Sequence, residues 1–97
     1  MNHATVFFSG AFRPLHAEAA TMPDAIRALK SRVSCPEIRA TIDSLNRSVS
    51  RQRKAGINVA SASHHGHGHG VALAYYARNP WLDSITETLP AHPAIKY

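Results

Sequence analysis

Apolar residues recur at helical spacing through the middle of the chain. After residue 37, four of them are separated by four, three and four positions and so lie on one stripe of a helix: Ile38, Ile42, Leu45 and Val49. Gly56 follows at the place where a left-handed glycine commonly ends a helix. The pattern predicts a helix over residues 35–54 whose buried face is this stripe.

A shorter helix is predicted before it. Thr21-Met22-Pro23-Asp24 is typical of a helix start, because the Thr21 hydroxyl can cap the helix and proline is tolerated in the first turn. The apolar residues that follow at helical spacing predict a helix over residues 22–32: Met22, Ile26, Leu29 and Val33. Residues 34–37 repeat this start, with Ser34 as the capping hydroxyl, so the two helices are expected to form a helical hairpin.

Three runs rich in β-branched, aromatic and small apolar residues predict strands. They cover residues 4–9, 57–63 and 70–77. The last two flank a His-Gly segment at residues 64–69 and are expected to form a hairpin with that segment at or near its tip. Residues 11–20 contain a proline and show no clear period, so a loop is predicted there.

The last predicted element is a short helix near the C-terminus. Asn79-Pro80 is a typical start, and three residues give this helix an apolar face: Leu82, Ile85 and Leu89. Two later prolines end it and leave an extended tail. The predicted order is therefore β-α-α-β-β-α. It favours an α+β domain with a small antiparallel sheet of two or three strands and the helices on one face.

Length and composition are typical of a small globular protein. The 97 residues, 44% of them hydrophobic, are enough for one core, so residues 1–97 are expected to form a single domain. Cys35 is the only cysteine, which excludes an intramolecular disulfide and fits a reducing compartment. No apolar run is long enough to span a membrane. A signal peptide has Lys or Arg before its apolar stretch, and none precedes the apolar N-terminal stretch of this chain. The expected location is the cytoplasm, without membrane attachment.

Charge is distributed unevenly along the chain. The formal net charge is +5, but residues 27–54 hold eight basic and two acidic residues, which gives +6 there and −1 elsewhere. A concentrated positive segment indicates an anionic partner. The usual partners are nucleic acid, an acidic protein surface and an anionic membrane.

Five cations of the longer predicted helix are the candidate partner-binding residues: Arg39, Arg47, Arg51, Arg53 and Lys54. Arg47, Arg51 and Lys54 are four and three positions apart and line one ridge, which can follow a row of phosphates. The alternative is a solvated helix face in which Asp43 pairs with Arg39 and Arg47. In that case the cations near the C-terminal end of the helix stabilise the negative end of its dipole. The basic segment lacks aromatic residues, which argues against stacking of single-stranded bases.

The histidines form a second candidate site. In an extended segment His65, His67 and His69 point to one side, about 6.5 Å apart in succession. Imidazoles at that spacing can converge on one zinc, nickel or copper ion. The alternative is a flexible polar loop, because glycines alternate with these histidines and binding would have to order the segment.

Little in the sequence indicates an enzyme. Cys35 falls in the first turn of a predicted helix, where a thiol can be activated, but a lone cysteine is more often a small buried residue. Ser61 and Ser63 stand beside His64 without a recognisable nucleophile elbow. The six carboxylates are scattered along the chain.

Two functions from different classes are therefore expected. The first is a non-catalytic binding protein, of accessory or inhibitor type, that docks through the basic helical hairpin on nucleic acid or on a complex that handles it. A phage-encoded inhibitor of a host defence complex would suit this size. The alternative is a metal-binding protein that uses the cluster from His64 to His69.

Overall fold

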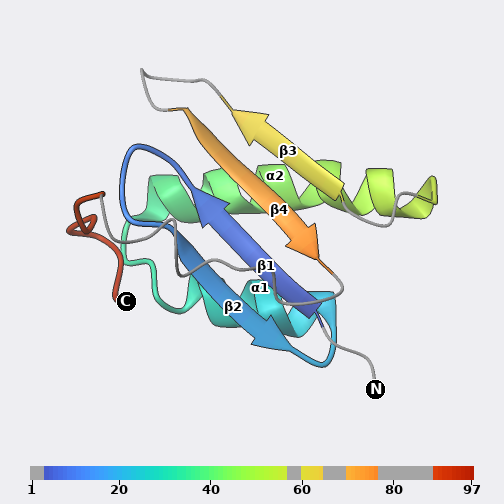
Figure 1. Ribbon diagram of the computed structural model, residues 1–97, viewed down its shortest axis with the longest axis horizontal. Helices are drawn as coiled ribbons and strands as arrows, with labels where there is room; N and C mark the ends of the chain where they lie inside the picture. Colours follow the sequence, from blue (N-terminus) through green and yellow to red (C-terminus); the bar gives the residue numbers. More distant parts are fainter. Residues whose placement is uncertain (1–3, 57–59, 65–69, 77–88) are drawn as a thin grey trace.

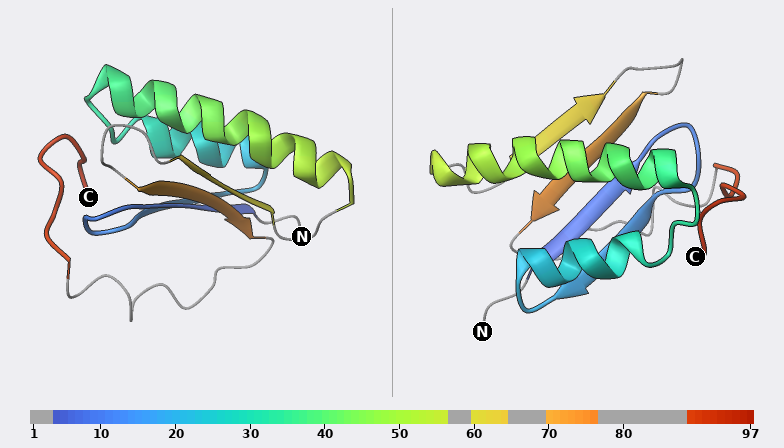
Figure 2. Two further views of the ribbon diagram at one scale, coloured as in Figure 1. Left: turned by 90° about the horizontal axis from the view of Figure 1, so that it is seen from above. Right: turned by 180° about the vertical axis from the view of Figure 1, so that it is seen from behind.

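The described residues fold into two layers, an antiparallel sheet and a pair of helices that cover one of its faces (Figures 1 and 2). The computed structural model describes residues 4–56, 60–64, 70–76 and 89–97. The elements within those residues are, in chain order, β1 (Ala4–Ser9), β2 (Leu15–Ala19), α1 (Met22–Lys30), α2 (Pro36–Lys54), β3 (Ala60–His64) and β4 (Val71–Tyr76). The predicted α+β class, with helices on one face of the sheet, is confirmed.

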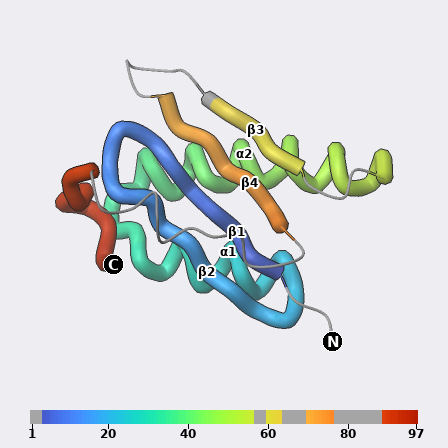
Figure 3. The backbone as a smooth tube through the Cα atoms, in the orientation of Figure 1, coloured from blue at the N-terminus to red at the C-terminus, as the bar shows by residue number. Residues whose placement is uncertain are grey.

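The sheet joins two hairpins through their inner strands. Its order is β2-β1-β4-β3 and every pairing is antiparallel, with Val6 of β1 opposite Ala17 of β2 on one side and Tyr75 of β4 on the other. Figure 3 follows the chain from the first hairpin through both helices into the second. α1 contacts mainly the first hairpin and α2 the second, so the two helices lie side by side across the sheet.

The prediction of a loop over residues 11–20 is wrong, because β2 lies within them. β2 pairs along the whole of β1, from Phe8 opposite Leu15 to Ala4 opposite Ala19. The segment has only five residues and is rich in alanine, which has little strand preference, so its strand is specified by pairing with β1. The sheet therefore has four strands rather than two or three, and the order through the described residues is β-β-α-α-β-β.

One core fills the space between the sheet and the helices. Alternate residues of the two central strands are buried in it, among them Val6 and Phe8 of β1 and Leu73 of β4. The apolar stripes predicted for the two helices are confirmed, because their central residues are also buried there: Ile26, Leu29, Ile42, Leu45 and Val49. Met22 and Ile38, at the starts of the stripes, are partly buried against the same core.

The two helix starts differ in how they are capped. At α1 the Thr21 hydroxyl accepts a hydrogen bond at 3.4 Å from the backbone amide three residues on, as predicted. At α2 the prediction of Ser34 as the capping hydroxyl is wrong, because the capping residue is Cys35, which makes no side-chain cap bond. The Ser34 hydroxyl donates instead to the Ala94 carbonyl at 3.2 Å. Gly56, two residues after α2, has a φ of 91°, which confirms the predicted left-handed glycine there.

Side chains cover backbone groups on both outer strands. On β3 the Gln52 amide donates to the Ser61 carbonyl at 2.7 Å and accepts from the Ser61 amide at 3.1 Å, as a neighbouring strand would. On β2 the Arg32 guanidinium donates to the His16 carbonyl at 3.0 Å. Unpaired backbone groups at a sheet edge invite pairing with another chain, so these contacts protect the sheet.

The C-terminal tail packs against the connection between α1 and α2. Ile95 forms a bridge with Val33, the Ser34 amide donates to the Ala94 carbonyl at 2.8 Å, and the Lys96 amide donates to the carbonyl of residue 32 at 2.7 Å. The predicted helix that starts at Asn79 falls largely on residues 77–88, which lie outside the described residues. In the described part of the chain, no helix is long and apolar enough to cross a membrane.

Candidate functional site

The exposure of the predicted cations follows from how α2 lies on the sheet. Its apolar stripe is buried against the strands, which turns the opposite side of the helix to solvent (Figure 2). Arg47, Arg51 and Lys54 lie on that side and are exposed. These three residues form a continuous basic face, called here the outer ridge.

The outer ridge has no carboxylate partner among the described residues. Asp43 pairs with Lys30 of α1 at 2.7 Å rather than with Arg39 or Arg47, so it does not neutralise the ridge. Arg51 donates to the Ser48 hydroxyl at 3.4 Å, a neutral partner on the same helix. The ridge cations therefore keep most of their hydrogen-bond donors available for an anionic partner.

Arg53 is separated from the outer ridge by its own contacts. Its guanidinium lies 3.8 Å from the centre of the Tyr75 ring of β4, and one of its nitrogens lies 3.3 Å from the Met22 sulfur of α1. A guanidinium over an aromatic face is attracted by the ring and is held in place. Arg53 thus ties the end of α2 to both the sheet and α1.

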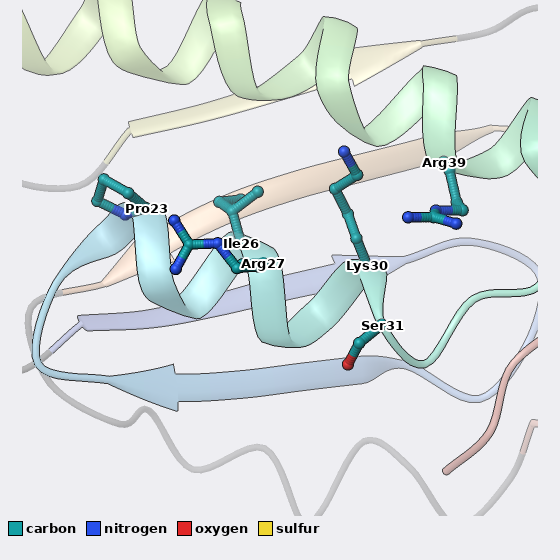
Figure 4. A pocket seen from close by; sticks show the side chains of 6 residues that line it. All are labelled: Pro23, Ile26, Arg27, Lys30, Ser31 and Arg39. Atoms are coloured by element: carbon teal, nitrogen blue, oxygen red, sulfur yellow. The ribbon is translucent and has the colours of Figure 1, made fainter.

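Arg39 lies on the flank of α2 that faces α1. Together with Arg27 and Lys30 of α1 it lines an open hollow of about 330 Å³ between the two helices (Figure 4). This feature, called here the inter-helix hollow, is completed by three uncharged residues: Pro23, Ile26 and Ser31. The five predicted cations therefore occupy three places, namely the outer ridge, the inter-helix hollow and the contact with Tyr75.

Sequence reasoning missed two participants in this surface. Arg27 and Lys30 were counted in the basic segment but not placed with Arg39, because only the side-by-side packing of the helices brings them together. Their spacing of three positions, which puts both on one face of α1, was the available signal. Nothing in the sequence pairs Arg53 with Tyr75, which is 22 positions away.

Comparison with protein families, curated proteins and solved structures finds no match to this chain. Its function is therefore inferred from its own charges and contacts. The main chemical feature of the described surface is its exposed cations, which can bind an anionic partner.

The histidine cluster lies largely outside the described residues. His65, His67 and His69 belong to residues 65–69, and the backbone of His64 ends β3 opposite Val71 of β4. The two strands that flank the cluster are therefore paired with each other up to its border, which confirms the predicted hairpin. Among the residues that the structure describes, no group of three or more His, Cys, Asp or Glu could hold a metal ion.

The cysteine and serines considered for catalysis lie at the start of α2 and on β3. Cys35 is half-buried at the start of α2. Ser61 and Ser63 are exposed on β3, where the backbone of Ser61 is bonded to Gln52.

Proposed function

We propose that this chain is a non-catalytic binding protein that docks on nucleic acid through the outer ridge of α2. The observation that supports it is the ridge itself, three exposed cations on one helix face without a carboxylate partner in the described residues. Long cationic side chains are the groups that contact phosphate oxygens. Such contacts supply essentially all of the sequence-independent affinity for nucleic acid.

The spacing of the ridge suits a charged polymer. From Arg47 to Lys54 the ridge extends about 10.5 Å along the helix axis, at about 1.5 Å per residue. Duplex DNA carries one negative charge per about 1.7 Å of its axis, so several phosphates come within reach of this length. Phosphate contacts position a protein without reading bases, which suits an accessory or inhibitor that occupies nucleic acid irrespective of sequence.

The helix dipole accounts for only part of this charge. Arg51 and Lys54 lie in the last turn of α2, where cations stabilise the negative end of the dipole. Arg47 lies before the last turn, and the effect of the dipole is largely confined to that turn. The continuation of the ridge beyond the last turn therefore favours a binding role over a purely stabilising one.

The salt dependence of duplex DNA binding tests this proposal. If the three ridge residues each neutralise one phosphate, the plot of log affinity against log salt concentration is expected to slope at about −2.7. Affinity then falls about 40-fold between roughly 50 and 200 mM salt. Two duplexes of unrelated sequence are expected to give the same curve. An affinity that does not change with salt concentration, or that is much higher for one of the two sequences, would contradict the proposal.

An acidic protein surface is the competing partner for the same ridge. Capture from a host lysate, with and without nuclease, separates the two partners. Nucleic-acid binding predicts that nuclease releases what the protein captures, and that the untagged protein purifies with a raised ratio of absorbance at 260 nm to that at 280 nm. Salt-sensitive capture of one complex that survives nuclease, without measurable duplex binding, would replace nucleic acid by an acidic protein as the partner.

Metal binding through the histidine cluster is the second candidate function. It is favoured by the β3–β4 pairing, which brings the two ends of the segment together at His64 and Val71. Zn²⁺ or Ni²⁺ is expected to bind with one-to-one stoichiometry and more weakly as pH falls, because neutral imidazole is the ligand. Substitution of His65, His67 and His69 together by alanine is expected to abolish the calorimetric signal. Identical isotherms for the wild type and the triple variant would exclude the site.

A further inference from the structure

The inter-helix hollow is an open concave space that cations from both helices line. Arg27 and Lys30 reach it from α1 and Arg39 from α2 (Figure 4). Its volume of about 330 Å³ lies at the lower end of the range found for small-molecule sites, about 300 to 1,000 Å³. The space therefore suits one small anionic group, whereas the outer ridge presents an open convex face.

The three cations of the hollow differ in their partners. Arg27 pairs with Asp24 at 2.7 Å, and Lys30 pairs with Asp43 at 2.7 Å. Arg39 is exposed and has no carboxylate partner among the described residues. Arg39 is therefore the cation in this group that most needs an external anion.

The two existing ion pairs are weak enough to be exchanged. The side chains of Arg27 and Asp24 are 76% and 53% exposed, and those of Lys30 and Asp43 are 25% and 44% exposed. Pairs in such contact with water contribute about 0–1 kcal/mol. An anion with more charge and more acceptor oxygens than a carboxylate can therefore replace Asp43 as the partner of Lys30 at little cost.

We propose that the inter-helix hollow binds a phosphate group, held by Arg39 and Lys30. A phosphate monoester carries up to two negative charges and three acceptor oxygens, which match a guanidinium fork on one side and an ammonium on the other. Asp43 then acts as a competitor that holds Lys30 while the hollow is empty. The phosphate can be free or be the end group of a nucleotide, and the latter source rests on the proposed nucleic-acid function.

The position of the hollow relative to the ridge supports the nucleotide source. Arg39 and Arg47 are eight residues apart on α2, which is about 12 Å along the helix axis. Both residues belong to α2, but Arg39 lies on the side that faces α1 and Arg47 on the side that faces solvent. A strand bound along the outer ridge can therefore reach the hollow with its terminal phosphate, whereas a duplex whose ends lie elsewhere makes only the three ridge contacts.

Titration with three ligands tests the hollow directly. Amide chemical shifts of ¹⁵N-labelled protein are followed with inorganic phosphate, adenosine 5′-monophosphate and adenosine. The two phosphate-bearing ligands are expected to shift the amides of Ser31 and Arg39, and adenosine is expected to leave them unchanged. Binding of both ligands assigns a free or nucleotide-borne phosphate to the hollow. Stronger binding of the nucleotide than of inorganic phosphate identifies the nucleotide as the source.

Three single variants separate the site from general attraction by a basic protein. Arg39→Gln is expected to weaken phosphate binding about tenfold, because a hydrogen bond to a charged partner is lost. Asp43→Asn is expected to tighten binding, because Lys30 no longer has a competing carboxylate. Arg13→Gln removes the same charge at an exposed position outside both the hollow and the outer ridge and is the matched control, with phosphate affinity expected to stay within about twofold of the wild type. Of the three substituted residues, Arg39 and Arg13 are exposed and Asp43 is half-buried outside the apolar core, so thermal melts are expected to agree with the wild type.

Several results would overturn the phosphate site. They are the same response to adenosine as to its monophosphate, an equal loss in Arg39→Gln and Arg13→Gln, and no gain in Asp43→Asn. Absence of any shift with phosphate would do the same. Failure of the wider function is seen separately, because duplex DNA binding is measured by its own salt dependence. Phosphate binding without duplex binding keeps the hollow and removes the nucleic-acid proposal, and the reverse result removes only the hollow.

Discussion

Leu45→Asp is expected to unfold the protein at room temperature. Leu45 lies at the centre of the buried stripe of α2, with 4% of its surface exposed. The substitution removes an apolar side chain, which costs about 2–5 kcal/mol, and places a carboxylate where the effective desolvation penalty is several kcal/mol more. A small domain has a total stability of about 5–15 kcal/mol, so the loss consumes most of it. Far-UV circular dichroism and a thermal melt measure the outcome.

Ser44→Asp is the matched control for that substitution. Ser44 is the preceding residue of α2 and is exposed, so the same carboxylate there remains in water. Substitutions at exposed positions usually change stability by less than about 0.5 kcal/mol, and the melting temperature is expected to stay near that of the wild type. If Leu45→Asp instead melted like Ser44→Asp, the assignment of the buried face of α2 would be wrong.

The double variant Arg47→Glu/Arg51→Glu is expected to lose duplex DNA binding by at least roughly 100-fold at low salt. Each residue is assigned one phosphate contact, and a hydrogen bond to a charged group contributes about 1.5–3 kcal/mol. Two lost contacts therefore cost about 3 kcal/mol or more, at about 1.4 kcal/mol per factor of ten. The new carboxylates add repulsion from the same phosphates. Fluorescence anisotropy with a labelled duplex measures the loss, and both sites are exposed, so the fold is expected to persist.

A second double variant controls for overall charge. Arg13 and Lys96 are exposed residues of the β1–β2 connection and the C-terminal tail, away from the outer ridge. Arg13→Glu/Lys96→Glu changes the net charge by the same amount as the ridge variant. Its duplex affinity is expected to fall much less, because long-range attraction changes while the three ridge contacts remain. Equal losses in the two variants would show that only net charge matters.

The fold was predictable where the spacing of apolar residues repeated over several turns of a helix. The stripe from Ile38 to Val49 spans three helical turns, and both its helix and its buried face are confirmed. β2 was missed because five alanine-rich residues carry too short an alternation, and its position is set by the residues of β1 opposite it. With β2 unseen, the sheet was predicted one or two strands short.

The site was predictable only as far as a single helix determines it. Exposure of Arg47, Arg51 and Lys54 follows from the position of the apolar stripe on the same helix, and it is confirmed. The spacing of residues on one helix does not predict which residues of other helices and strands they contact. Lys30 reaches Asp43 and Arg53 reaches Tyr75 because of how the helices cross the sheet, so neither contact was foreseen.

The same local limit applies to the capping of α2. Ser34 has the residue type of a helix cap, and the proline and acid that follow it fit the usual pattern. The C-terminal tail supplies the competing partner, because the Ala94 carbonyl accepts from both the amide and the hydroxyl of Ser34. A contact between residues 60 positions apart thus overrides a signal of four residues.

The most direct test of the central claim is the salt dependence of duplex DNA binding measured in parallel for the wild type and the two double variants. Contacts between the outer ridge and phosphates predict a slope of about −2.7 for the wild type and for Arg13→Glu/Lys96→Glu, because both keep three contacts. For Arg47→Glu/Arg51→Glu they predict a slope no steeper than about −0.9, or binding too weak to measure. The same slope and affinity for the wild type and the ridge variant would contradict the claim and leave the outer ridge as a solvated helix face.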